Sequence, residues 1–132
     1  MKQIKLFILL LFIFQSCMPV ASDKSMDINV DELSQNSQTT YKVNIGEKIS
    51  FKTNVHGSVG MGAEQEISDE KILKLENSET IYNNPNFDAP GGDAAMQKFT
   101  FTALSKGKTK VKIKKVFRGN LEKETVLEVE VI

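Results

Sequence analysis

The stretch Lys108-Thr109-Lys110-Val111-Lys112-Ile113-Lys114 alternates charged and apolar or small side chains without a break. Alternation with a period of two puts one kind of side chain on each face, which is typical of a half-buried β-strand. A second alternating stretch, Glu124 to Val131, follows a turn at 118–121. Together the two stretches predict a β-hairpin with one apolar and one charged face.

The six lysines between residues 106 and 115 could form a stripe that binds phosphate groups. A tight hairpin around Asn120 instead sets lysines of one strand against glutamates of the next. Opposite charges across a hairpin contribute a few tenths of a kcal/mol per pair, so a solvated, charge-matched face is favoured. The pairs involve Lys110, Lys112, Glu128 and Glu130. The alternation slips at 115–117, which predicts a β-bulge.

Shorter alternating stretches precede this hairpin, separated by glycine or polar turns. They are 41–45, 47–53, 63–67, 72–76 and 96–104. With no helical periodicity, they predict an all-β chain folded as an immunoglobulin-like antiparallel β-sandwich of about seven strands. The predicted core consists of Val43, Ile45, Ile49, Phe51, Leu73, Leu75, Phe99, Phe101, Val111, Ile113, Leu127 and Val129.

The N-terminus has the features of a targeting segment. Lys2 and Lys5 precede an apolar run from 6 to 14, which is too short to span a membrane. The run leads to Cys17, the chain's only cysteine, so an intrachain disulfide is impossible. This arrangement resembles a bacterial lipoprotein signal, and an ordinary secretory signal is the alternative. The resemblance implies removal of residues 1–16 and a lipid on Cys17 that anchors the chain in the bacterial cell envelope, facing the periplasm or the cell surface.

The remaining 116 of the 132 residues suffice for one domain. Residues 17–38 are polar and predict a flexible tether, in which 28–30 is a weak strand candidate, and 39–132 would form the β-sandwich. Without Lys2 and Lys5 the chain has 15 basic and 17 acidic side chains. That balance argues against a nucleic-acid or anionic-membrane partner held by bulk charge. Separately, we expect a monomer.

Catalytic chemistry is scarce in this sequence. The chain has a single histidine, His56, and no serine in a nucleophile-elbow setting. Metal sites with soft ligands need several histidines or cysteines, which the chain lacks. We therefore expect no enzyme, no metal and no cofactor.

Three loops carry a resemblance to a known family. His56-Gly57-Ser58-Val59-Gly60-Met61 follows a predicted strand, Pro90-Gly91-Gly92-Asp93 precedes another, and Val116-Phe117-Arg118-Gly119 joins the last two. Their order and spacing resemble the chagasin family of β-sandwich inhibitors of papain-type cysteine peptidases. The family's loops read Asn-Pro-Thr-Thr-Gly-aromatic, Gly-Gly and Arg-Pro-Trp/Phe.

The resemblance implies that the three loops block the active-site cleft of a papain-type cysteine peptidase from a host, a competitor or the same organism. The implied contact residues are His56, Gly57, Ser58, Val59, Gly60, Met61, Gly91, Gly92, Phe117 and Arg118. A structural or adhesive immunoglobulin-like module of the cell envelope, without inhibitory activity, is the alternative. A third hypothesis is small-ligand binding at the loops, with His56 as a pH-sensitive contact.

Overall fold

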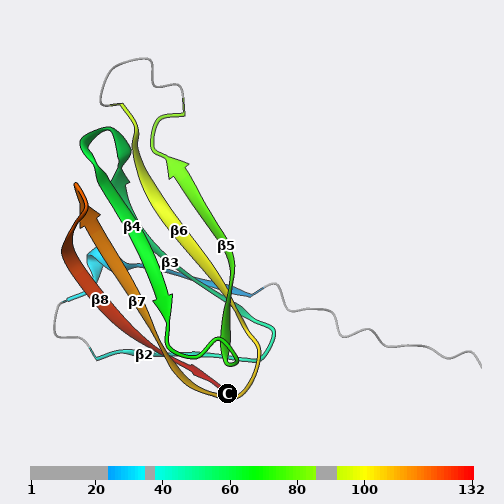
Figure 1. Cartoon of the computed structure of the whole chain (residues 1–132). Helices are drawn as coiled ribbons and strands as arrows, with labels where there is room; N and C mark the ends of the chain where they lie inside the picture. The colour runs from blue at the N-terminus through cyan, green and yellow to red at the C-terminus, as the bar shows by residue number, and fades with distance from the viewer. Residues whose placement is uncertain (1–23, 35–37, 86–91) are drawn as a thin grey trace, which may run out of the picture.

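Eight β-strands and two short 3-10 helices make up the computed structural model, which describes residues 24–34, 38–85 and 92–132 (Figure 1). The strands are β1 (Ser25–Asn29), β2 (Thr40–Val43), β3 (Lys48–His56), β4 (Met61–Ile67), β5 (Leu73–Tyr82), β6 (Ala94–Ala103), β7 (Gly107–Phe117) and β8 (Asn120–Val131). The 3-10 helices are η1 (Val30–Glu32) and η2 (Gly57–Val59). The all-β prediction is confirmed. Within the described ranges, no helix is long and apolar enough to cross a membrane.

Hydrogen bonding links the strands in the order β2-β8-β7-β4-β3-β6-β5, and β1 pairs with β3. β3 and β4 meet at the register pair His56–Met61. Because β3 and β4 share only this register pair and separate beyond it, the sheet divides into two layers. One layer is β1-β3-β6-β5 and the other is β2-β8-β7-β4. The pairings of β1 with β3 and of β2 with β8 are parallel, whereas all the others are antiparallel.

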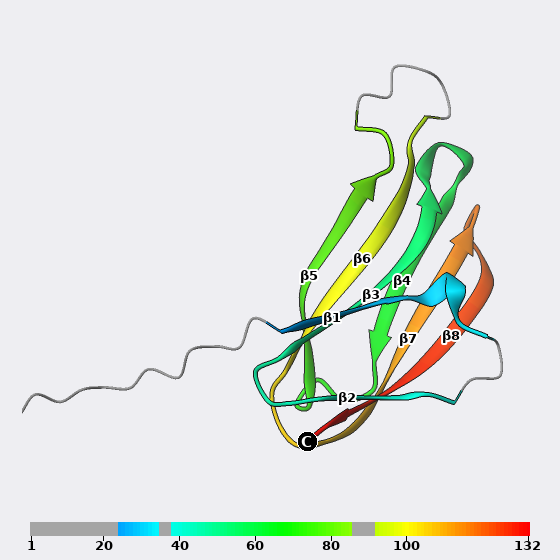
Figure 2. The same ribbon diagram turned by 180° about the vertical axis from the view of Figure 1, so that it is seen from behind.

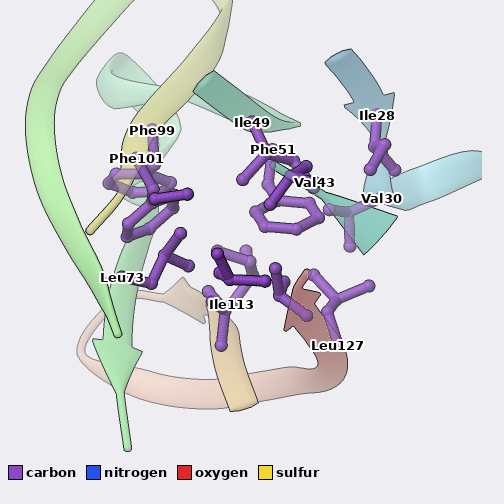
Figure 3. Close-up of a cluster of buried hydrophobic side chains, with 14 residues drawn as sticks. Ile28, Val30, Val43, Ile49, Phe51, Leu73, Phe99, Phe101, Ile113 and Leu127 are labelled. Atoms are coloured by element: carbon purple, nitrogen blue, oxygen red, sulfur yellow. The ribbon is translucent and has the colours of Figure 1, made fainter. Parts of the chain in front are cut away.

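The core lies between the two layers, where alternate side chains of facing strands meet (Figure 3). The Phe51 ring lies 5.9 Å from that of Tyr41 and 6.0 Å from that of Phe101. Most of the predicted core is buried, but Ile45 is 51% exposed. That prediction was wrong because Ile45 sits in a turn before Gly46, where φ is +86°. Leu75 packs against the core but is only half-buried.

Strand β1 and helix η1 lie within the segment 17–38, which was predicted to be a flexible tether (Figure 2). β1 lies parallel to β3, and Ile28 and Val30 are buried in the core with 9% and 3% exposure. The folded domain therefore includes residues 25–32, and the boundary at residue 39 was wrong. The predicted signal peptide and Cys17 lie outside the described residues.

The β7–β8 hairpin has the charge-matched face that the alternation predicts. Lys110 lies opposite Glu128, and Lys108 opposite Glu130. On the other side of β7, the ammonium group of Lys114 lies 2.7 Å from the Glu66 carboxylate of β4. The register shifts between Lys115 and Val116, as the predicted bulge requires. The lysine row is thus matched by acidic side chains from both neighbouring strands.

Candidate functional site

Three connections lie at one end of the sandwich, which we call the loop end (Figure 1). The first loop, residues 57–60, joins β3 to β4, and the third loop, residues 118–119, joins β7 to β8. The second loop, residues 83–93, joins β5 to β6, and residues 83–85 and 92–93 of it are described.

The strand residues next to the three loops pair with one another across neighbouring strands. His56 pairs with Ala94 on one side and with Met61 on the other. Met61 pairs in turn with Phe117, and Phe117 with Asn120. This continuous row of register pairs means that all three loops begin or end at neighbouring positions, although they are far apart in the sequence.

The first loop is a tight turn that depends on glycine. Gly60 has φ of +82° and donates its N–H to the Gly57 carbonyl oxygen at 3.0 Å. A side chain rarely adopts this left-handed conformation. A Cβ at Gly60 would also lie 3.0 Å from Arg118 Cγ. Both effects favour glycine at this position, and Val59 lies exposed at the tip of the loop.

The Asp93 carboxylate fastens the second loop to the first. The backbone N–H of Ser58 donates to Oδ2 at 2.8 Å, the Ser58 hydroxyl donates to Oδ1, and Nε2 of His56 lies 3.0 Å from Oδ1. The Ser58 hydroxyl bond, together with the Ser58 amide and the charge of His56, holds the pKa of Asp93 below its ordinary value. The carboxylate is therefore ionised at neutral pH and holds the two loops together.

The third loop is a two-residue turn with an unusual backbone. Arg118 and Gly119 have φ of +49° and +81°, which is the geometry of a type I′ hairpin turn. Arginine in this region is strained by about 1 kcal/mol. The Arg118 N–H donates to the Gly60 carbonyl oxygen at 2.7 Å, and its guanidinium lies 5.1 Å from the centre of the Phe117 ring. The third loop is thus pinned to the first.

Large apolar side chains remain exposed around these loops. They are Val59, Ile81, Tyr82, Phe117 and Leu121. A hollow of about 270 Å³ lies below the first loop, between Met61 and Tyr82. These side chains lie in or next to the loops and are accessible for contact with another molecule.

The predicted site residues fall mainly at the loop end. Those at the loop end are His56, Gly57, Ser58, Val59, Gly60, Met61, Gly92, Phe117 and Arg118. Gly91 lies outside the described residues. His56 is the last residue of β3 and is partly buried against Asp93, rather than fully exposed in a loop.

Asp93 and Leu121 are not among the contact residues that the resemblance implied. Asp93 follows the Gly-Gly pair directly, and a short carboxylate there is able to accept hydrogen bonds from a neighbouring turn. Nothing in the sequence indicates that the neighbour would be Ser58, 35 residues away. Among the residues that the structure describes, no group of three or more metal-ligating side chains occurs.

Comparison with known proteins gives a match at the level of structure. No protein-family model and no curated protein matches the chain. Among solved structures, the cysteine protease inhibitor EhICP2 from Entamoeba histolytica matches with a TM-score of 0.66 and 12% identity, over 82% of this chain and 96% of that chain. Amebosin gives a TM-score of 0.62 and 16% identity, over 83% of this chain and 99% of that chain.

A third solved structure, PbICP-C in complex with falcipain-2, gives a TM-score of 0.54 and 8% identity, over 81% of this chain and 99% of that chain. The shared feature is the arrangement of the strands, since so few residues are identical. The chain therefore has the fold of these three solved structures, as the resemblance to the chagasin family implied.

Proposed function

We propose that this protein inhibits papain-type cysteine peptidases by filling the active-site cleft with its three loops. The observation that carries the proposal is that hydrogen bonds join the first loop to the second and to the third at one end of the sandwich. The fold that presents these loops is also that of EhICP2. PbICP-C, of similar fold, forms a complex with falcipain-2. The similarity to these two solved structures does not favour the alternative function of a structural or adhesive module.

The first loop would lie over the catalytic cysteine of the peptidase. Its two glycines leave the backbone slim, and hydrogen bonds from Ser58 and to Gly60 fix its shape before binding. A loop that is already ordered loses little conformational entropy in the complex. The inhibitor needs no reactive group, because occupation of the cleft is enough to exclude substrate.

The third loop would contact one wall of the cleft. Phe117 provides an exposed aromatic face, and Arg118 stacks a cation on it. Aromatic and arginine side chains are frequent hot spots in protein interfaces. Three adjoining loops are able to bury the roughly 1,600 Å² that is typical of protease–inhibitor complexes.

We further propose that a lipid on Cys17 anchors the protein in the bacterial cell envelope with its loops facing away from the membrane. The chain enters the fold at Ser25, opposite Lys48, whereas the loop end lies at His56, about 26 Å along β3. Cys17 lies eight residues before Ser25, so the lipid would be joined to the end of β3 that is far from the loops, at most about 29 Å from Ser25. The anchor would therefore hold the end opposite the loops.

Inhibition is tested by titrating papain with the mature chain carrying Cys17→Ser, with a fluorogenic peptide as substrate. Competitive inhibition at submicromolar concentration is expected, and full papain activity at micromolar concentrations would count against the proposal. The anchor is tested separately by detergent phase partition in the bacterial host. The wild-type protein should enter the detergent phase and the Cys17→Ala variant the aqueous phase; equal partition would refute lipidation.

A further inference from the structure

Asp31, in η1, lies between the part of β3 that leads into the first loop and the part of β7 that leads into the third loop. Its Oδ2 accepts a hydrogen bond from the Asn54 backbone N–H at 2.7 Å. Its Oδ1 accepts bonds from the Thr53 hydroxyl at 2.9 Å and the Lys115 ammonium at 3.1 Å. In Figure 2, β1 and η1 run along the side of the sandwich toward β7. One carboxylate therefore joins two strands that are not neighbours in the sheet.

The contact between Asp31 and the Asn54 amide lies at a break in the strand pairing of β3. One edge of β3 pairs with β6 along its whole length, from Lys48 to His56. The other edge pairs with β1 as far as Lys52 and meets β4 at His56. Asn54 falls in the gap between these partners. Neither strand offers an acceptor to the Asn54 N–H there, and the Asp31 carboxylate accepts its hydrogen bond.

Lys115 brings the third loop into the same arrangement. It precedes the bulge in β7 and lies two residues before Phe117. Its side chain is 18% exposed and that of Asp31 is 20% exposed, so water screens their attraction less than at an open surface. Burial raises the pKa of Asp31, but the bonds from Asn54, Thr53 and Lys115 outweigh it and lower the pKa overall. The ion pair is therefore intact at neutral pH.

We propose that Asp31 is a positioning residue that sets the spacing between the first and third loops. The N-terminal segment would then be part of the inhibitory machinery instead of a passive link to the membrane. The second tie between these loops, from the Arg118 N–H to the Gly60 carbonyl, lies beyond the Asp31 contacts and depends on the same spacing. The effect on inhibition rests on the proposed function, but the effect on loop order does not.

The test compares Asp31→Ala with Asp27→Ala in the mature chain carrying Cys17→Ser. Asp27 is a matched control, because it also lies in the N-terminal segment and its carboxylate pairs with Lys98 of β6 at 3.1 Å. Hydrogen exchange of backbone amides is followed by NMR at a temperature where circular dichroism shows both variants folded. The Arg118 amide should exchange at least tenfold faster in Asp31→Ala and within twofold of wild type in Asp27→Ala.

Unchanged exchange at Arg118 in Asp31→Ala would overturn the proposal. So would equal acceleration at Arg118 and at the core amide of Val111, since that indicates global destabilisation. If Asp31→Ala does not fold, Lys115→Met removes the same link from the other side, and the same criteria apply. With papain, the inhibition constant should rise at least tenfold for Asp31→Ala. Altered exchange in a protein that never inhibits papain would refute the proposed function and leave the positioning role standing.

Discussion

At the residue scale, the shape of the loop end depends on a few short side chains and on glycine. Asp93 and Asp31 each use one carboxylate to connect segments that are distant in the sequence. Gly60 adopts a conformation that other residues avoid and allows close approach of Arg118. These contacts join loops that are far apart in the sequence.

Gly60→Ala should destabilise the protein by about 1–2 kcal/mol, because alanine at φ of +82° is strained and its Cβ meets Arg118 at 3.0 Å. The matched control is Gly62→Ala, where a Cβ meets nothing within 4 Å and φ is not in the left-handed region. The control should leave the free energy of unfolding unchanged or raise it slightly. Urea denaturation measures both variants, and equal stabilities would contradict this account of the turn.

The Asp93 link should break only in strong acid. The pKa of Asp93 is lowered in the folded protein, so its stabilising effect is present above its ordinary value near 3.8 and is lost as pH falls through the lower folded value. The Ser58 amide resonance should therefore titrate with a midpoint below 3.8 in NMR spectra, and Asp93→Asn should abolish the transition. A midpoint at or above the ordinary value would show that the hydrogen bonds do not hold the loop in solution.

At the scale of elements, strict alternation predicted the clearest strands, and the structure contains them. The β7–β8 hairpin was predictable because both its faces are distinct in the sequence and its charges are complementary. Strand β1 was assigned to the tether because its only apolar residues are Met26 and Ile28, and parallel pairing with β3 leaves no turn signal between the two strands. Ile45 was misplaced because alternation continues into a turn, where burial depends on the neighbouring strands.

Removal of the N-terminal strand should destabilise the fold. A chain that begins at residue 39 lacks the buried side chains of Ile28 and Val30, each of which contributes roughly 1.5–3 kcal/mol on burial, and also lacks the Asp31 contacts. Thermal unfolding by circular dichroism should show a lower midpoint for residues 39–132 than for residues 24–132. Identical midpoints would mean that β1 is only loosely attached.

At the scale of the whole molecule, the two ends of the sandwich differ. Three connections gather at one end, whereas the chain enters the fold at the other. The sequence predicted this gathering through the order and spacing of the loops, although few loop residues match the family pattern. It could not predict how the loops are fastened, because the Asp31–Lys115 contact joins residues 84 positions apart.

If the loop end blocks the peptidase cleft, a charge placed at its tip should weaken inhibition, whereas a charge at the opposite end should not. The most direct test compares inhibition of papain by wild type, by Val59→Asp at the tip of the first loop and by Ile45→Asp in a turn at the opposite end. Both residues are exposed, so neither change buries a charge in the core. We predict competitive inhibition by wild type and Ile45→Asp with equal inhibition constants, and a loss of about 100-fold for Val59→Asp. Equal inhibition constants for the two variants, or no inhibition by wild type, would contradict the account.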